Sequence, residues 1–225
     1  FLMNAKTIPR WRGLATVLIA LVAGAQAGDL TWIGPSNGDW FVAGNWSGSG
    51  DYPQDGDSVL ISSNSVALSN STAVLTSFTI ANATLFFTNW TTALIGSNVT
   101  IQGGGMLSLP AAFPNNQISN RVWIVCTELT VGTNGSINVD GLGYARGNGP
   151  GKGTNSYGGG GYGGEGGDYY GAAGGGLSYG TAGAPLDPGS GGANSGGGHG
   201  GGAVLIDART VRVEGTVSAN GGNGV

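Results

Sequence analysis

Residues with side chains suited to catalysis are few and widely spread in this sequence. The chain has one histidine, His199, and one cysteine, Cys126. His199 lies inside a glycine run, where no framework is evident to hold a Ser/His/Asp triad or a multi-histidine metal site. Cys126 falls at a position expected to face inward on a strand, where a small apolar residue suits a core. We therefore predict no catalytic role and no metal-binding role for either residue.

Two glycine-containing motifs look like ligand-binding loops. Residues 147–154 read Gly-Asn-Gly-Pro-Gly-Lys-Gly-Thr, but Gly153 stands where a phosphate loop needs Ser or Thr to reach magnesium, and the spacing before Gly151 is wrong. Residues 163–171 fit one calcium-binding nonapeptide of the repeats-in-toxin type, yet such sites take ligands from stacked copies, and the sequence has no second copy. We reject the first motif and take the second as weak evidence, so no cofactor is predicted.

Asp207 and Arg209 share a predicted outward strand face, as do the acidic and basic groups of polysaccharide-cleaving β-helices. Opposite charges two positions apart on a strand are typical of a solvated pair, and no carboxylate cluster for calcium accompanies them. The chain is therefore not interpreted as an enzyme. A polysaccharide lyase or glycoside hydrolase of the β-helix type is the alternative function.

Tyrosines gather in the block 141–202, about half of which is glycine. Ordering such a block costs about 1–2 kcal/mol per residue, which exceeds what burial of six tyrosine rings returns. Unless the glycine segments pack side by side through backbone hydrogen bonds, we expect a mobile outward loop with exposed rings. Tyrosine offers contact area at low entropic cost. The predicted surface or glycan contacts are Tyr157, Tyr162, Tyr169, Tyr170 and Tyr179.

The elements that must position these residues are short apolar segments that recur in pairs. Val59, Phe78, Val99, Leu129 and Val211 occupy equivalent positions, and the first steps between them are about 20 residues, the length of one solenoid coil. Two longer copies also align with each other. They are residues 122–131 with 135–141, and residues 204–213 with 215–221.

Two insertions, 110–120 and 141–202, lengthen the later steps but leave the register of the apolar positions intact. This is expected when coils stack on their neighbours and insertions leave as loops. Alternation on the strands places Val122, Ile124 and Cys126 inward, and Trp123 and Val125 outward. After the corner, Leu129 and Val131 are expected to face inward, as are Val211 and Val213, which match them in the second copy. The sequence thus predicts an all-β fold, a parallel β-helix (solenoid) with a long glycine-rich loop insertion. An antiparallel β-sandwich is the alternative, because short strands with turn signals also describe it.

The N-terminal 27 residues have the order of a secretory signal peptide. Three basic residues precede the apolar run 14–22, and Ala25-Gln26-Ala27 follows it. The run is well short of the roughly 18 residues that a membrane-spanning helix needs. We predict cleavage after Ala27 and a secreted or cell-surface location.

The tryptophans Trp32, Trp40 and Trp46 lie just ahead of the first paired segments. Because a solenoid needs its first coil covered, we interpret this region as a cap. An exposed aromatic platform for sugar rings is the competing interpretation. The expected organisation is a signal peptide at 1–27, a cap at 28–57, coils at 58–140, the glycine and tyrosine insertion at 141–202, and a coil truncated at the C-terminus at 203–225.

Composition excludes some partners. The formal net charge is −4, and removal of residues 1–27 would make the chain more acidic, whereas nucleic-acid binding needs clustered Lys and Arg. A single cysteine leaves no internal disulfide. We expect no nucleic-acid partner and no membrane span in the mature fragment.

The pattern from Trp32 to Trp46, followed by Tyr52-Pro53 and the segment Asp57-Ser-Val-Leu-Ile61, resembles the opening of autotransporter-passenger-like and related secreted β-helix proteins of bacteria. Residues 200–206 and 213–222 are similar to glycine-rich repeats of surface proteins in the same class. The resemblance implies a right-handed parallel β-helix at the bacterial cell surface, often adhesive, and supplies no catalytic residues. The expected function is an exported structural or adhesive scaffold, with polysaccharide or cell-surface glycans as candidate partners.

Overall fold

The computed structural model describes residues 27–224 except residues 49, 172, 182 and 184. The predicted signal peptide therefore lies outside the described residues, apart from Ala27. The fold is all-β, and its helical content within the described part is one short 3-10 turn, η1 (Ala43–Asn45). In the part of the chain that is described, no helix is long and apolar enough to cross a membrane.

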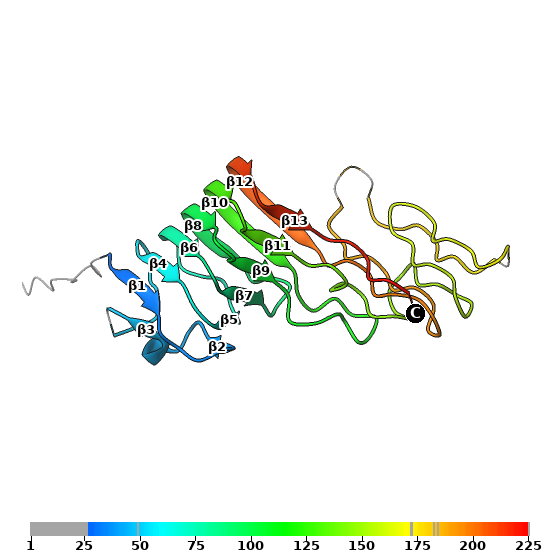
Figure 1. The fold of residues 1–225 in the computed structure, drawn as a ribbon, viewed down its shortest axis with the longest axis horizontal. Helices are drawn as coiled ribbons and strands as arrows, with labels where there is room; N and C mark the ends of the chain where they lie inside the picture. Colours follow the sequence, from blue (N-terminus) through cyan, green and yellow to red (C-terminus); the bar gives the residue numbers. More distant parts are fainter. Residues whose placement is uncertain (1–26, 49, 172, 182, 184, 225) are drawn as a thin grey trace, which may run out of the picture.

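The strands form two sheets, and from β4 onward successive strands alternate between them (Figure 1). The seven-stranded sheet has the order β12-β10-β8-β6-β4-β1-β3, and the six-stranded sheet has the order β13-β11-β9-β7-β5-β2. The strands are β1 (Asp29–Trp32), β2 (Gly38–Asp39), β3 (Trp46–Ser47), β4 (Ser58–Ile61), β5 (Ser65–Leu68), β6 (Leu75–Ile80), β7 (Thr84–Phe87), β8 (Leu94–Ile101), β9 (Met106–Ser108), β10 (Val122–Val131), β11 (Ser136–Asn138), β12 (Val204–Val213) and β13 (Thr216–Ser218).

Neighbouring strands pair in parallel, with β1 and β3 as the antiparallel exception among the described ladders. Parallel neighbours need a crossover between them, and here each crossover passes through the other sheet. The antiparallel β-sandwich that the sequence left open as an alternative is therefore wrong.

The strand register confirms the equivalent positions expected from the sequence. Val59 pairs with Phe78, and Phe78 pairs with Val99. Leu129 pairs with both Val99 and Val211, so the pairing is kept across both insertions. The two long copies also pair as aligned, with Val122 beside Val204 and Ile137 beside Val217.

Inward residues of both sheets form one hydrophobic core. Val122, Ile124, Leu129 and Val131 are buried, as alternation predicts, and Cys126 is partly buried against the core. The expectation that Val211 and Val213 are also buried is wrong: they are 47% and 49% exposed. Their strand β12 is the edge of its sheet in the described part of the chain, so no further described strand covers these side chains.

Left-handed residues recur where the chain turns into the six-stranded sheet. Asn64, Asn82 and Asn134 have φ of 64°, 49° and 59° and lie just before β5, β7 and β11, while Gly104, with φ 82°, precedes β9. Asn and Gly are the residues that adopt this conformation most readily. The small polar turns of the sequence thus supply the corner that each crossover requires.

Three tryptophans close the N-terminal end of the core. Trp32, Trp40 and Trp46 are buried, and their rings meet edge to face, with centroids 5.1 Å apart for Trp32 and Trp46 and 4.7 Å apart for Trp40 and Trp46. The indole Nε1 of Trp46 donates to the carbonyl oxygen of Trp40 at 2.7 Å. Because these rings are enclosed, they do not form the sugar platform that was the competing interpretation.

The glycine block does not form the expected mobile loop. Its segments lie side by side as an extension of the molecule and are joined by backbone hydrogen bonds (Figure 1). The successive N–H groups of Gly143, Tyr144 and Ala145 donate to three different segments, at Gly200, Gly189 and Phe113. In a polyproline II-like chain each residue is rotated by about a third of a turn from the one before it, so three successive N–H groups point in three directions. The bonding of residues 143–145 follows this pattern. The glycine segments therefore pack side by side through backbone hydrogen bonds.

Glycine is required here because the segments approach too closely for a side chain. A Cβ on Gly200 would lie 1.8 Å from the carbonyl oxygen of Gly189, and one on Gly176 would lie 1.8 Å from that of Gly151. The insertion 110–120 joins the same structure: Phe113 is fully buried and packs edge to face on Tyr144, with centroids 5.4 Å apart. Both insertions thus belong to one ordered extension.

Candidate functional site

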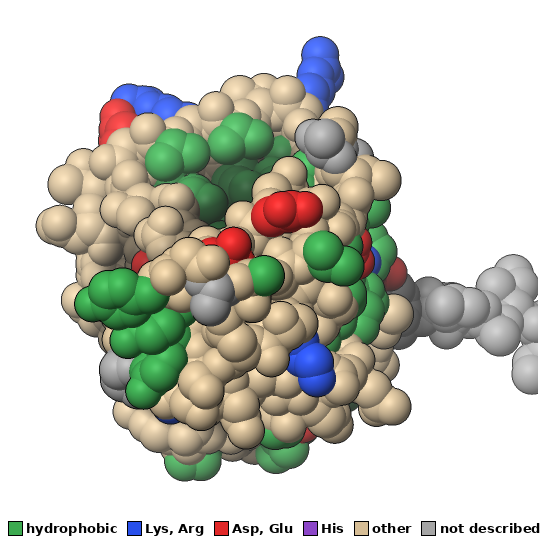
Figure 2. Space-filling model, turned by 90° about the vertical axis from the view of Figure 1, so that its right-hand side faces the viewer, with side chains coloured by type: hydrophobic (Ala, Val, Ile, Leu, Met, Phe, Trp, Pro, Cys, Tyr) green, Lys and Arg blue, Asp and Glu red, His purple; other side chains and the backbone are tan. Residues whose placement is uncertain are grey.

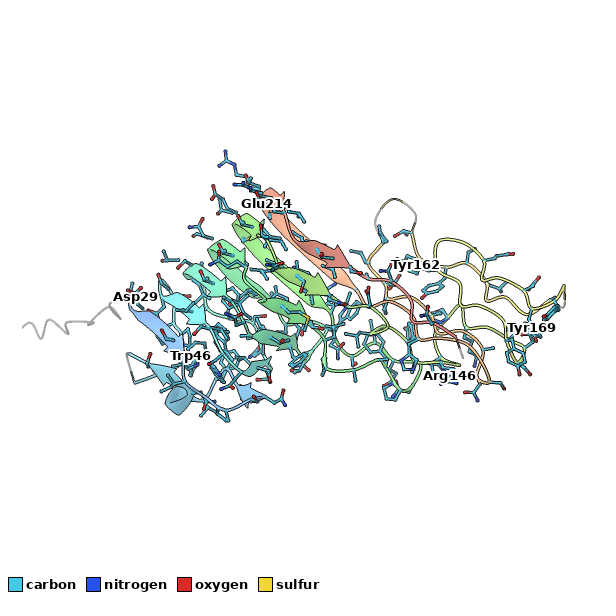
Figure 3. The ribbon with its side chains drawn as sticks, in the orientation of Figure 1. Asp29, Trp46, Arg146, Tyr162, Tyr169 and Glu214 are labelled. Atoms are coloured by element: carbon cyan, nitrogen blue, oxygen red, sulfur yellow. The ribbon has the colours of Figure 1, made fainter. Side chains whose placement is uncertain are left out.

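Three of the five predicted contact tyrosines form an exposed cluster on the glycine extension. Tyr157, Tyr169 and Tyr170 are 49%, 43% and 91% exposed. The ring centroids of Tyr157 and Tyr169 are 4.5 Å apart, and Tyr169 meets Tyr170 edge to face at 4.5 Å. Figure 3 shows Tyr169 at the far end of the extension, away from Asp29 and Trp46. We call Tyr157, Tyr169 and Tyr170 the aromatic tip.

Side-chain oxygens hold the backbone around the aromatic tip. The Oδ1 of Asn155 accepts from the N–H groups of Tyr157 and Gly158 at 3.0 and 2.6 Å. The Oδ1 of Asp168 accepts from the N–H groups of Gly174 and Gly175 at 2.8 and 2.7 Å, and these bonds lower the pKa of this carboxyl. The tip is thereby tied to the glycine segments.

Tyr162 and Tyr179 do not share this exposure, so their prediction as solvent-presented rings needs correction. Their rings pack edge to face with centroids 5.0 Å apart, and the Tyr179 hydroxyl donates to the carbonyl oxygen of Pro188. Burial raises the pKa of Tyr179 to about 12. These two rings lie half-buried between neighbouring glycine segments. Their burial could not be predicted from the composition of the block.

A hollow of about 720 Å³ lies among the glycine segments and the start of β12. Its wall is mostly glycine backbone and includes Tyr157, Tyr162, Asp187, Ser190 and His199. Figure 2 shows this end of the molecule, where a hollow opens in a face covered largely by backbone and small polar side chains. Among the described residues, no hydrogen bond links His199 to Asp187 or Ser190, so the hollow has no assembled triad.

Polar groups of the two glycine motifs, residues 147–154 and 163–171, are used in hydrogen bonds within the protein. In residues 147–154, the N–H groups of Gly147, Gly153 and Thr154 donate to carbonyl oxygens of neighbouring segments, so these groups do not face an anion. In residues 163–171, the carboxylate of Asp168 accepts the two backbone bonds described above. Within the described part of the chain, no group of three or more His, Cys, Asp or Glu residues is placed to hold a metal ion.

The remaining residues singled out from the sequence, Asp207, Arg209 and Cys126, do not form a site together. Asp207 and Arg209 form no ion pair, and the salt bridge found among the described residues joins Arg212 and Glu214. Burial raises the pKa of the Cys126 thiol, and the nearby charge of Asp207 raises it further. A raised pKa disfavours the reactive thiolate.

One cluster was not anticipated from the sequence. The guanidinium of Arg121 lies over the rings of both Trp90 and Trp123, at 4.9 and 4.6 Å from the ring centroids. The sequence carried one partial signal, because Trp123 was expected on the outward face of a strand that begins next to Arg121. Trp90 was not connected to it, because the turn before β8 is adjacent only in the folded chain.

Comparison with known proteins gives one match. A family model described as G8 domain matches residues 45–140. This part of the chain begins next to the cap tryptophan Trp46 and ends just after β11. No curated protein and no solved structure shows a significant match. The chain is therefore similar to a G8 domain over less than half of its length.

Proposed function

We propose that this protein is an exported structural and adhesive scaffold of the cell surface or extracellular space. In this proposal the two parallel sheets are the faces of a right-handed parallel β-helix, and the chain passes through each face once per coil. The in-register pairing of Val59, Phe78 and Val99 supports a coiled arrangement, since equivalent residues stack at successive levels. The resemblance of the Trp32–Ile61 pattern to secreted bacterial β-helix proteins supports the surface location.

The observation that carries the adhesive role is the aromatic tip. Exposed tyrosine rings would bury apolar surface on contact with a partner, and this burial favours binding. Tyrosine also stacks on sugars and other surfaces. Tyr170 is almost fully exposed and adopts φ 49°, a conformation unusual for a non-glycine residue. The ordered glycine segments behind the tip hold it away from the sheets, so a large surface or a polysaccharide can reach the rings.

The test is binding of the mature protein, residues 28–225, to cells and to a panel of immobilised polysaccharides. Replacing Tyr157, Tyr169 and Tyr170 together by Ser should weaken binding at least about tenfold, because each aromatic contact contributes about 0.5–1.5 kcal/mol. The matched variant with Phe at the same three positions should retain most of the binding. A Ser variant that folds and binds like the wild type would overturn the proposal.

One further measurement separates this proposal from its alternative, and another tests export. Depolymerisation of a polysaccharide by the unmodified protein would favour the lyase or hydrolase function instead. For export, N-terminal sequencing of secreted material should find Gly28 as the first residue, because Ala25 and Ala27 are small enough for signal peptidase. Retention of residues 1–27 on secreted material would contradict the export step.

A further inference from the structure

Arg121 is held on the protein surface by two aromatic rings. It immediately precedes β10, Trp123 is the second residue of that strand, and Trp90 belongs to the connection between β7 and β8. The guanidinium centre is 4.9 Å from the Trp90 ring centroid and 4.6 Å from that of Trp123. All three side chains are partly exposed. We call these residues the Trp-Arg-Trp cluster.

The guanidinium of the cluster has no counter-ion among the described residues. No carboxylate of the described chain lies within ion-pair distance of Arg121, and its side chain makes no hydrogen bond to these residues. Its Nε is buried and lacks a partner, as do Trp123 Nε1 and the Oδ1 of the adjacent Asn120. Buried polar atoms are nearly always hydrogen-bonded in native proteins, so three unpaired atoms on neighbouring residues require an explanation.

We propose that the Trp-Arg-Trp cluster binds an anionic sugar residue of an acidic polysaccharide. A guanidinium matches a carboxylate or sulfate group with two parallel hydrogen bonds, and such charge-assisted bonds are stronger than neutral ones. The flat indole rings beside it suit the apolar face of a sugar ring. The two requirements of an anionic sugar, a planar cation and an adjacent aromatic surface, thus meet in one place.

Cation–π packing alone accounts for only part of this arrangement. Contact with the rings stabilises Arg121 by about 0.5–1 kcal/mol at a partly exposed site, but it satisfies none of the five N–H donors. Arg121 is partly withdrawn from water, and this burial lowers the pKa of its guanidinium. An anion that pairs with the guanidinium would replace this lost hydration.

The inference rests on the proposed adhesive function and adds a ligand class to it. The cluster lies on the sheet side of the molecule at β10 and the β7–β8 connection, whereas the aromatic tip lies on the glycine extension. The two sites can therefore be removed one at a time. Binding to neutral surfaces by the Ser tip variant tests the proposed function. Binding to an acidic polysaccharide by an Arg121 variant tests the inference about the Trp-Arg-Trp cluster.

The experiment titrates the mature protein with three polymers: a polyuronate, a sulfated polysaccharide and a neutral glucan. Tryptophan fluorescence is the readout, because Trp90 and Trp123 are partly exposed while Trp32, Trp40 and Trp46 are enclosed in the core. The solution should contain about 0.15 M salt, where the screening length is about 8 Å, so that the acidic net charge does not repel the polymer at long range. We expect binding to an anionic polymer, and the carboxylated and sulfated arms identify the group.

Arg121→Gln should weaken binding to the anionic polymer by about 10- to 100-fold, the usual effect of losing a charge-assisted contact. Arg121→Lys keeps the charge without the planar fork and should give an intermediate loss. Arg209→Gln removes a cation from the outward face of β12 and is the matched control, expected to bind normally. Unchanged affinity in a folded Arg121→Gln or Arg121→Lys variant would overturn the inference. An equal fluorescence response to the neutral glucan in the Ser tip variant, which lacks the aromatic tip, would overturn it as well.

Discussion

The backbone N–H of Asn220 donates to the carboxylate of Asp140, which lies 80 positions earlier in the chain. These residues hold the same place in the two long aligned segments, one just after β11 and the other just after β13. The hydroxyl of Ser218 donates to the same carboxylate oxygen. One carboxylate therefore joins two strands that the whole glycine block separates in sequence.

Replacing Asp140 by Asn should lower stability and remove part of its pH dependence. The hydrogen bond from Ser218, together with those from Asn220, lowers the pKa of Asp140 in the folded protein. A lowered folded pKa adds stability at pH values above the unfolded value, near 3.9, and this contribution is lost as the pH falls through the folded pKa. Because the group is exposed, we expect an effect of about 0.5–1 kcal/mol at neutral pH.

Denaturant unfolding at pH 7 and at pH 2.5 would check this prediction, with Glu128→Gln as the control for loss of an exposed acid. The difference between wild type and Asp140→Asn should shrink at the lower pH. An equal difference at both pH values would contradict the assigned cause.

Gly200→Ala should destabilise the glycine extension strongly. The added Cβ would lie 1.8 Å from the carbonyl oxygen of Gly189, so one segment must move and break its backbone bonds. Overpacking of this kind costs about 1–3 kcal/mol, or roughly 2–12 °C in melting temperature for a chain of this size. Gly164→Ala is the matched control, because no atom beyond its own chain neighbours lies within 4 Å of its added Cβ. Equal melting temperatures for the two variants would show that the segments are not closely packed.

Cys126 should react slowly with thiol reagents in the folded protein. Burial raises the pKa of its thiol, and the charge of Asp207 adds to this effect. The rate of alkylation at pH 7.5 should be lower than that of the unfolded chain and should increase with pH. Asp207→Asn should lower the thiol pKa slightly and raise the folded-state rate, whereas a reduced rate in that variant would contradict the electrostatic contribution.

Trp46→Phe should cost more stability than Trp32→Phe. Both indoles are buried, but Trp46 Nε1 donates to the Trp40 carbonyl oxygen, whereas Trp32 Nε1 has no partner. The two substitutions remove similar volume, so their difference isolates the hydrogen bond, worth about 1 kcal/mol. Thermal unfolding of both variants measures it, and a larger loss for Trp32→Phe would reverse the assignment.

The strand register was predictable from sequence because it depends on local alternation. Val59, Phe78, Val99, Leu129 and Val211 are each followed two positions later by Ile or Val. Where a strand buries one face, a shift of one residue would turn this apolar pair to solvent, so few registers are possible. The enclosure of the cap tryptophans followed from their size and from the need to cover a core end. These features depend on residue type and spacing, which a single sequence displays directly.

The glycine extension and the Trp-Arg-Trp cluster were not predictable in the same way. Glycine has no side chain to form an apolar pattern, and its packing here relies on backbone groups that every sequence contains. Entropy arguments favoured a mobile loop because the number of hydrogen bonds between segments was unknown. Trp90 meets Arg121 only through the stacking of β8 on β10, a contact that no local motif encodes.

The hydrogen bonds of the glycine extension have a mechanical consequence. A two-stranded ribbon pulled at its end unzips, because the load falls on one bond at a time. Here consecutive N–H groups of residues 143–145 bond in three directions, to segments at Gly200, Gly189 and Phe113. A pull along the segments therefore loads several of these bonds together in shear, and the extension is built to transmit such tension toward the sheets.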